Sequence, residues 1–410
     1  MMEQTNLVPK RRFKEFQNTH AWEQRKVGKL ADIVRGASPR PIQDPKWFDD
    51  ESDIGWLRIA DVTEQNGRIH YLEQRISKAG QEKTRVLTEP HLLLSIAATV
   101  GKPVVNYVKT GVHDGFLIFH NPKFDREFMF QWLEMFRPKW QKYGQPGSQV
   151  NLNSDLVKNQ EIVLPSEEEQ KKISDFFAQL DHLITLHQRK LEKTKALKSA
   201  YLSEMFPAEG EREPKRRFAG FTHAWEQRKL GEVADIIGGG TPSTSNEEYW
   251  DGEIDWYSPV EIGEQTYFDS SQKKITELGL QKSSAKILPI GTVLFTSRAG
   301  IGNTAILAKE GATNQGFQSI VPHKDELDSY FIYSRTHELK RYGETNGAGS
   351  TFVEVSGKQM AKMPMLIPTL EEQKKIGGFF ERLDHLIALH QRKLEKLQNI
   401  KKAYLNEMFV

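Results

Sequence analysis

Two histidines five residues apart occur twice in the chain, which makes them the first candidates for metal chemistry. His182 and His187 recur as His385 and His390, 203 positions later. Helical zinc ligands commonly stand at i and i+4, because that spacing puts both imidazoles on one face of the helix. A spacing of five separates the two rings around the helix. We therefore interpret all four as seam or surface histidines and predict no metal site.

The tripeptide EQK is the second candidate, because a Glu-x-Lys fragment occurs in some nuclease sites. It stands at residues 169–171 and 372–374, each time in the first turn of a predicted helix, and no suitably placed acidic partner precedes it. The chain also lacks the GxxxxGK[ST] phosphate loop, the HExxH zinc motif and the GxSxG elbow. We predict no catalytic residue. A metal-dependent nuclease that uses Glu169 or Glu372 is kept as an alternative.

Polar side chains that can contact the edges of DNA bases are interleaved with strand-like runs in the second half of the chain. The runs GTVLFTSRAGIGNTAILA (291–308) and GFQSIVP (316–322) are punctuated by glycines, which is typical of bulged or tightly turned sheet. Arginine can contact guanine through two hydrogen bonds, and Asn or Gln can contact adenine. The candidates of this kind are Arg298, Asn303, Asn314 and Gln315. Each of them is equally well interpreted as a turn residue that satisfies its own backbone.

Length and composition limit the class of protein. A chain of 410 residues is too long for one ordinary core, so we expect two or more domains. There is no cysteine, which excludes disulfides and thiolate chemistry. No run of about 18 apolar residues predicts a membrane span, and the first residues lack the apolar core of a signal peptide. We therefore expect a cytoplasmic protein that does not contact a membrane.

Charge leaves the question of nucleic acid open. The whole chain carries a net charge of +2. Residues 10–165 contain 24 Lys and Arg against 19 Asp and Glu, which is +5, and residues 216–365 contain 16 against 19, which is −3. A basic patch is a surface property that such sums can hide.

A repeat of about 203 residues organises the chain, and repeats of this kind decide the fold. The stretch LDHLITLHQRKLEK (180–193) returns as LDHLIALHQRKLEK (383–396), with one difference in fourteen positions. The motif HAWEQRK occurs at 20–26 and at 223–229. RRF likewise occurs twice, at 11–13 and 216–218. The two ends of each copy are therefore well matched.

The middles of the two copies differ strongly but share a skeleton. Its members in the first copy recur at matching places in the second: Gly36, Pro39, Trp47, Ile54, Trp56 and Gly115-Phe116 match Gly239, Pro242, Trp250, Ile254, Trp256 and Gly316-Phe317. We therefore predict one fold with two different surfaces. The predicted parts are an N-terminal segment (1–19), domain 1 (20–165), a central helix (166–206), a linker (207–222), domain 2 (223–367) and a C-terminal helix (368–410).

The repeated segments are predicted to be long helices. Ser166 with Glu169, and Thr369 with Glu372, fit the S/T-x-x-E capping box, in which the Glu side chain returns to the N–H of the capping residue. Gly377-Gly378 interrupts the second helix near its start, where we expect fraying or a kink.

Apolar residues in both helices alternate at steps of three and four, as in a coiled-coil seam. The seam residues are Phe177, Leu180, Ile184, His187, Leu191 and Tyr201 in the first helix, and Phe380, Leu383, Ile387, His390, Leu394, Leu397 and Tyr404 in the second. We favour packing of the two helices on each other, since nearly identical stripes are self-complementary in a two-fold arrangement. The alternative is that each helix packs on its own domain.

Taken in order, these motifs resemble the specificity (S) subunit of type I restriction–modification enzymes over essentially the whole chain. The resemblance is carried by the HAWEQRK entries, TSRAGIGNTAI (296–306), TNQGFQSI (313–320), GSTFVEVSGKQMAKMPMLIPTLEEQKKI (349–376) and the duplicated helices. It implies an α+β fold with two target recognition domains, each mixed α/β and strand-rich. Long helices separate and follow these domains and form an antiparallel coiled coil, which gives a pseudo-two-fold tandem repeat.

The resemblance also implies a function. Each domain would read one half of a bipartite, asymmetric site in double-stranded DNA, and the helices would set the spacer and dock the modification subunits. The chain would be non-catalytic and would bind no cofactor. Two modification subunits would carry S-adenosylmethionine and methylate adenine, and two restriction subunits would use ATP and Mg. The competing hypothesis is a coiled-coil assembly adaptor that does not read DNA.

Domain 1 departs from the family pattern at one place. Where domain 2 has TSRAGIG, domain 1 reads LLLSIAATVGKPVVN (92–106). The DNA-binding candidates that remain in this part of domain 1 are Lys102, Asn106, Lys109 and His113.

Overall fold

The computed structural model describes residues 7–140, 152–263, 265–298, 300–348 and 353–410. Ala299 and residues 349–352, which belong to two motifs of the resemblance, lie outside this part. The chain divides into two compact units, which are described separately: unit 1 comprises Met1–Gln188 and Arg392–Val410, and unit 2 comprises Arg189–Gln391. Among the described residues, no helix is both long enough and apolar enough to cross a membrane.

Unit 1 contains a five-stranded sheet in the order β2-β9-β6-β7-β4. Its strands are β2 (Asp32–Arg35), β9 (Phe116–His120), β6 (Leu92–Ser95), β7 (Pro103–Asn106) and β4 (Arg68–Ile69). All neighbours are antiparallel except β7 and β4. Side chains alternate between the two faces of a strand, and accordingly Leu92 and Leu94 join one buried core while Leu93 joins another. Helix α3 (Arg126–Trp140) contributes to the first core.

A smaller sheet completes domain 1, with β3 (Gly55–Trp56), β8 (Thr110–Val112) and β5 (Arg85–Leu87) in the order β3-β8-β5.

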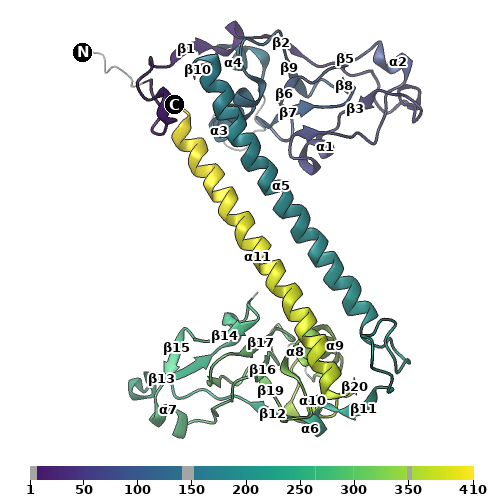
Figure 1. The fold of residues 1–410 in the computed structure, drawn as a ribbon, viewed down its shortest axis with the longest axis vertical. Helices are drawn as coiled ribbons and strands as arrows, with labels where there is room; N and C mark the ends of the chain where they lie inside the picture. The colour runs from purple at the N-terminus through teal and green to yellow at the C-terminus, as the bar shows by residue number, and fades with distance from the viewer. Residues whose placement is uncertain (1–6, 141–151, 264, 299, 349–352) are drawn as a thin grey trace. The chain divides into compact units, whose positions relative to one another are not determined.

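Unit 2 repeats this architecture (Figure 1). Its large sheet has the order β12-β19-β16-β17-β14, and its small sheet the order β15-β13-β18. The strands are β12 (Ala234–Gly238), β19 (Gln318–Pro322), β16 (Val293–Phe295), β17 (Thr304–Leu307), β14 (Tyr267–Phe268), β15 (Lys273–Ile275), β13 (Trp250–Tyr257) and β18 (Ala312–Thr313). The last pair of the large sheet is again parallel and the others antiparallel. The prediction of one fold for both domains is confirmed.

The repeated HAWEQRK motif, at the start of each domain, pairs with the strand at the end of the same domain. Its last four residues form β1 (Glu23–Lys26), which pairs antiparallel with β10 (Glu161–Leu164) directly before the first long helix. In unit 2, β11 (Glu226–Lys229) pairs in the same way with β20 (Pro364–Ile367). The two ends of each domain therefore meet where the long helix begins.

The long helices are α5 (Glu167–Glu204) and α11 (Leu370–Met408), coloured teal and yellow in Figure 1. In unit 1, the start of α5 packs on the end of α11, and the rings of Phe176 and Tyr404 are 4.9 Å apart. In unit 2, the end of α5 packs on the start of α11, and the rings of Tyr201 and Phe379 are also 4.9 Å apart. The segments therefore run antiparallel in each unit.

Both packing hypotheses hold, because each helix pair also packs on its domain. Phe409 contacts Phe128 of α3, with ring centroids 5.2 Å apart. In unit 2, Phe206 contacts Phe331 of the short helix α8 (Ser329–Ser334) at 5.7 Å. All thirteen predicted seam residues are buried or half-buried. Leu186, Leu197 and Leu389, on other faces of the same helices, are exposed.

The capping-box prediction is half wrong. The backbone N–H of Glu169 does donate to the Ser166 hydroxyl, at 3.4 Å. Its carboxylate, however, is 1% exposed and accepts from the Nε and Nη2 of Arg12 at 2.7 and 2.6 Å. Arginine wins this competition because its fork matches both carboxylate oxygens.

Glu372 behaves in the same way in unit 2. It accepts from the Nε and Nη2 of Arg217 at 2.7 and 2.8 Å. The duplicated RRF motif therefore binds the segment that precedes each domain to the start of the long helix that follows that domain. A carboxylate buried in such an ion pair is not available to a metal, which argues against the nuclease alternative.

The predicted weakness at Gly377-Gly378 is not present, since α11 is continuous from Leu370 to Met408. A Cβ on Gly377 would lie 2.6 Å from Asp328 Oδ1 and 3.0 Å from the backbone nitrogen of Phe331. The glycine is therefore required by the close approach of the start of α8, and this contact supports the helix there.

Candidate nucleic-acid interface

Two loops of domain 1 meet at one end of the sheets. The loop that follows β2 is held against the turn before β9, because Gly36 N donates to Phe116 O at 2.9 Å and Ala37 N donates to Val112 O at 3.0 Å. A Cβ on Gly36 would lie 2.1 Å from the carbonyl oxygen of His113. Only glycine allows this approach.

Domain 2 builds the same junction from the matching residues. Gly240 N donates to Thr313 O at 2.8 Å. A Cβ on Gly239 would lie 2.0 Å from the carbonyl oxygen of Asn314. A tryptophan is buried beneath the junction in both domains, Trp56 at 4% exposure and Trp256 at 6%. Gly36 and Trp56, with their counterparts Gly239 and Trp256, are therefore a framework. The predicted match of Trp47 with Trp250 is wrong by one position, because Trp250 pairs with Ile275 as Phe48 pairs with Ile76.

The side chains on this framework differ between the domains. We call the five positions the loop site. In domain 1 it consists of Ser38, Arg40, Arg58, His113 and Asp114, and in domain 2 of Thr241, Ser243, Ser258, Asn314 and Gln315. Domain 1 thus presents two arginines, a histidine and a carboxylate where domain 2 presents hydroxyls and amides.

Several hydrogen bonds of the loop site occur at equivalent positions in both domains but join different residue types. The Ser38 hydroxyl donates to Asp114 Oδ1 at 2.8 Å, and the Thr241 hydroxyl donates to the Gln315 side-chain oxygen. Gly115 N donates to His113 Nδ1 at 2.9 Å, and Gly316 N donates to Asn314 Oδ1 at 2.7 Å. The turn interpretation of Asn314 is thus correct for its oxygen, which caps its own turn.

A third pair of equivalent bonds fixes the wall of the site. Arg58 N donates to Asp61 at 2.8 Å, and Ser258 N donates to Glu261 at 2.8 Å. The Arg58 guanidinium also contacts Asp61 and Glu73, which occupies its Nε and Nη2 groups. These contacts hold Arg58 along the rim.

The loop site of domain 1 encloses a shallow pocket of about 290 Å³. Arg40, Trp56, Arg58 and His113 are among its lining residues. Burial would raise the pKa of the Asp114 carboxyl, but the Ser38 hydroxyl and the charges of Arg40 and Arg35 lower it overall. Burial lowers the pKa of His113, against the opposing effect of Asp114. The pocket therefore holds a neutral imidazole and an ionised carboxylate beside two arginines.

The predicted DNA-binding residues fall into two groups. His113, Asn314 and Gln315 lie in the loop sites. Sequence reasoning missed Arg40, Arg58, Ser38, Thr241, Ser243, Ser258 and Asp114, although a signal was present. These unlike residues stand one or two positions from the matched Gly, Pro and Trp residues.

The other candidates of domain 1 lie elsewhere and already have partners. Asn106 is fully buried, accepts from His91 N at 2.8 Å and donates to two backbone carbonyls. Lys102 is 12% exposed and pairs with Glu134. Lys109 pairs with Asp53 at 2.6 Å, with half of its side chain exposed.

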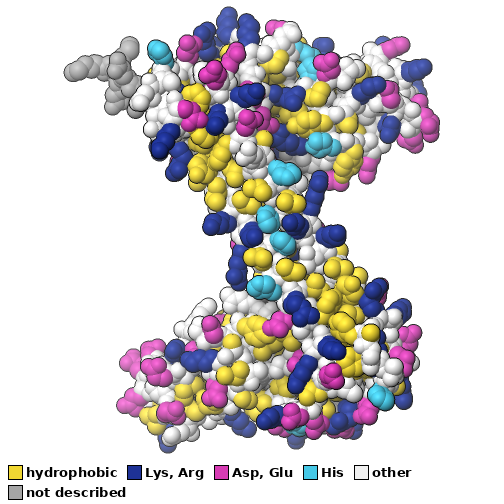
Figure 2. Space-filling view, in the orientation of Figure 1, with side chains coloured by type: hydrophobic (Ala, Val, Ile, Leu, Met, Phe, Trp, Pro, Cys, Tyr) yellow, Lys and Arg dark blue, Asp and Glu magenta, His cyan; other side chains and the backbone are white. Residues whose placement is uncertain are grey.

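In domain 2, Arg298 and Asn303 both lie between β16 and β17 along the chain. Arg298 pairs there with Glu354 at 2.8 Å, and Asn303 is exposed. Lys and Arg side chains (dark blue) are scattered among Asp and Glu (magenta) over both domains on the face drawn in Figure 2. That face shows no single basic stripe among the residues drawn in colour.

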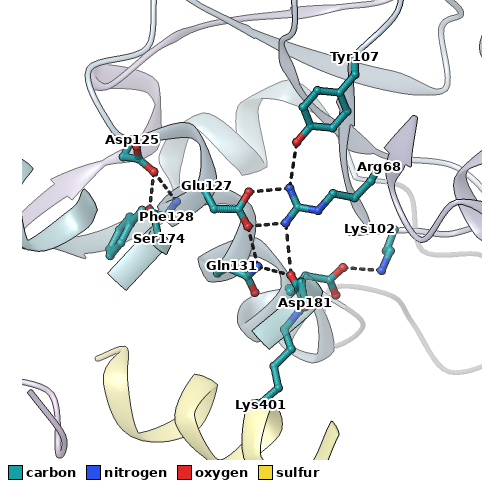
Figure 3. Close-up of polar contacts among 11 residues, drawn as sticks. Arg68, Lys102, Tyr107, Asp125, Glu127, Phe128, Gln131, Ser174, Asp181 and Lys401 are labelled. Carbon is teal, nitrogen blue, oxygen red and sulfur yellow. Dashed lines mark hydrogen bonds and ion pairs between the residues drawn. The ribbon is translucent and has the colours of Figure 1, made fainter. Parts of the chain in front are cut away.

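A polar network seats domain 1 on the helices (Figure 3). Arg68 of β4 donates to both oxygens of Glu127 on α3, one at 2.6 Å, and to Asp181 of α5 at 3.4 Å. Gln131 donates to Glu127 and Asp181, each at 2.8 Å. Lys401 of α11 donates to Asp181 at 2.6 Å. We call these five residues the Asp181 network.

At the matching place in unit 2, the ion pair between the two long helices is kept, but the residues that the domain contributes are different. Lys198 donates to Asp384 at 2.5 Å, as Lys401 does to Asp181. Tyr330 stands in place of Glu127 and donates to Asp384 at 2.9 Å. Tyr267 stands in place of Arg68 and donates to Glu381 at 2.6 Å. The two tyrosine rings are 6.2 Å apart. The contact between domain and helices is therefore ionic in unit 1 and aromatic in unit 2.

Within the described ranges, no group of three His, Asp or Glu side chains is arranged to hold a metal ion. His182 and His385 are exposed, whereas His187 and His390 are half-buried on their helices.

The chain thus consists of two domains of one fold, with unlike loops on a like framework, and two near-identical long helices. The family model described as "Type I restriction modification DNA specificity domain" matches residues 20–196 and 223–399. The chain belongs to this family.

Known relatives agree. The chain is 34% identical over 189 residues to the specificity subunit of the type I restriction enzyme MjaIX of Methanocaldococcus jannaschii, covering 45% of this chain and 44% of that one. It is 29% identical over 169 residues to the EcoR124I/EcoR124II specificity subunit of Escherichia coli, covering 39% and 41%. The matched stretches thus span less than half of these curated relatives.

A solved structure supports the fold over the full length. The S subunit of a type I restriction–modification system from M. genitalium has a TM-score of 0.65 at 14% identity, with 98% of this chain and 99% of that chain covered.

Proposed function

We propose that this chain is the DNA sequence-specificity subunit of a type I restriction–modification complex, in which each domain reads one half of a bipartite, asymmetric site. The observation that carries the proposal is the loop site. Two domains share strand order and a Gly–Trp framework, yet present arginines and a carboxylate in one case and amides and hydroxyls in the other. Base-edge contacts of these kinds distinguish sequences.

The helices provide the frame in this proposal. The 38 residues of α5 would extend about 57 Å at the α-helical rise, more than the roughly 34 Å of one turn of DNA. The helices would set the spacer between the two half-sites and dock two modification subunits. The predicted boundaries of the domains, from 20 to 165 and from 223 to 367, are the units to be exchanged.

Catalysis is assigned to the partners. The chain supplies recognition and no cofactor. Two modification subunits would bring S-adenosylmethionine and methylate adenine, and two restriction subunits would bring ATP and Mg. These encounters with DNA would take place in the cytoplasm. Lysines and arginines that contact phosphates release counterions, so affinity should fall steeply as salt rises.

A domain exchange tests the proposal. Residues 20–165 are replaced by the corresponding domain of another family member, and the chain is expressed with its modification subunit. Methylation mapping should then show one half-site changed and the other retained. A change in both half-sites would contradict the modular assignment. Absence of any sequence-dependent methylation in the wild-type complex would favour the adaptor hypothesis instead.

A further inference from the structure

The loop sites differ in which side chain faces outward, and this difference rests on one residue after a shared proline. In domain 1 that residue is Arg40, whose side chain is 75% exposed and whose Nη2 donates to Asp114 Oδ2 at 2.7 Å. In domain 2 it is Ser243, which has no charge and bonds to Ser245 at 2.9 Å. The outermost group is therefore an arginine in one domain only.

Asp114 is held rigidly beneath Arg40. Its Oδ1 accepts from the Ser38 hydroxyl at 2.8 Å, and the backbone N–H of Asp114 donates to Ser38 Oγ at 3.2 Å. Arginine carries five N–H donors, and no bond from the Nε or Nη1 of Arg40 is present within the described residues. A guanidinium fixed at one corner loses less conformational freedom when it binds. The remaining donors suit the O6 and N7 acceptors of guanine.

Gln315 occupies the place of Asp114 in domain 2. It is exposed, and its side-chain oxygen accepts from the Thr241 hydroxyl, the counterpart of Ser38. With Ser243 in place of the arginine, nothing basic at this position covers the amide. A primary amide offers one donor and one acceptor side by side, which matches N7 and the N6 amino group of adenine.

We propose that Arg40, oriented by Asp114, reads a guanine in the half-site of domain 1, and that Gln315, oriented by Thr241, reads an adenine in the half-site of domain 2. This inference rests on the proposed function and adds the base that each domain recognises. It makes Arg40 and Gln315 the specificity-determining residues. Asp114 and Thr241 are positioning residues.

The test uses the full chain in complex with its modification subunit. Double-stranded oligonucleotides carry the mapped target with each position varied in turn, and methyl transfer from S-adenosylmethionine is measured. Arg40→Gln should reduce the preference for guanine at one position roughly tenfold to a hundredfold, with the other half-site unchanged. Arg25→Gln removes an exposed charge from β1 and is the matched control, with no change in preference expected.

A graft tests the second domain by gain of function. Ser243→Arg combined with Gln315→Asp transfers the arginine–carboxylate pair of domain 1, and guanine should replace adenine at one position of the second half-site. Persistence of the adenine preference in the graft would overturn the assignment of Gln315. An unchanged guanine preference in Arg40→Gln, or a first half-site without guanine, would overturn that of Arg40.

Failure of the inference can be distinguished from failure of the proposed function. If the wild-type complex methylates a specific site and both variants retain its preferences, only the assigned residues are wrong. If the wild-type complex shows no sequence preference, the proposed function itself fails.

Discussion

The Nζ of Lys401 lies 2.6 Å from the carboxylate of Asp181, and a shift of 203 positions turns this pair into Lys198 with Asp384, 2.5 Å apart. Each long helix therefore gives an aspartate to one unit and a lysine to the other. The side chains are 16–26% exposed. The two near-identical helices thus form the same ion pair once in each unit.

Breaking the pair should destabilise unit 1. Asp181→Asn leaves Lys401 without a charge partner in a partly buried place, while Arg68 keeps Glu127, and we expect a loss of about 1–2 kcal/mol in the free energy of unfolding. Urea denaturation of the full chain measures this loss. Adding Lys401→Met to Asp181→Asn should recover part of it, because the lysine that lost its partner is then replaced by an apolar side chain.

The matched control is Glu192→Gln, which removes an exposed carboxylate 3.9 Å from Lys195 on the same helix. Little change is expected there. Equal losses in Asp181→Asn and Glu192→Gln would show that the Asp181 network contributes nothing beyond general helix electrostatics.

The ionic contact between domain and helices in unit 1, and the aromatic contact in unit 2, give a second prediction. Burial would lower the pKa of Arg68, but the contact with Glu127 raises it overall, so the guanidinium stays charged. Glu127→Tyr alone removes the main partner of Arg68 and leaves only Asp181 at 3.4 Å, which should cost about 2–3 kcal/mol. Adding Arg68→Tyr recreates the aromatic pair of unit 2, in which burial raises the pKa of Tyr330 and keeps it a neutral donor.

Thermal unfolding of the single and double variants checks this substitution. The double variant should be more stable than Glu127→Tyr, because replacing a whole buried ion pair costs less than removing one partner. A double variant that is less stable than both single variants would contradict the equivalence of the two contacts between domain and helices.

The sequence predicted the architecture because its signals are local or repeated. Heptad spacing and an uninterrupted run of helix formers are sufficient for α5, and the duplicated motifs mark both domains. The fate of Glu169 was not predictable in this way. Its partner Arg12 lies 157 positions earlier, and a capping box was the only local use for its carboxylate. Long-range ion pairs of this kind leave no trace in periodicity.

The loop sites were predictable in part for the same reason. Asn314 and Gln315 were predicted as DNA-binding candidates from their residue type. Arg40 was not predicted, because the orientation of its side chain depends on Asp114, which lies 74 positions away in the sequence. Conversely, Asn106 has a suitable residue type but is used by the fold to satisfy a loop backbone.

A third prediction concerns pH. Burial against Trp56 and Phe116 lowers the pKa of His113 from its ordinary value of 6.5, with Asp114 opposing the shift. Just below pH 6.5 the unfolded chain therefore binds a proton that the folded domain does not, and stability falls as pH drops through this window. His113→Asn should remove this contribution while keeping the acceptor for Gly115 N, as Asn314 does in domain 2.

Unfolding of wild type and His113→Asn is compared at pH values of about 7.5 and about 5.5. The wild type should lose more stability than the variant on acidification, and other titrating groups cancel in the difference. Equal losses would mean that His113 is not held neutral by its surroundings.

The last prediction tests the helix seam with two leucines of one helix. Leu191 is 4% exposed and Leu197 is 42% exposed, so the same substitution meets opposite surroundings six residues apart. Leu191→Asp places a carboxylate among apolar side chains and should cost about 3 kcal/mol or more. Leu197→Asp keeps its charge in water and should change stability little.

Assembly provides an independent measurement. We expect Leu191→Asp to weaken co-elution with the modification subunit in size-exclusion chromatography, because the helices that would dock it are loosened. Leu394→Asp, at the matching place of α11 and 8% exposed, should behave in the same way. If Leu191→Asp and Leu394→Asp left both the unfolding midpoint and the assembly at the level of Leu197→Asp, the seam assignment would be wrong.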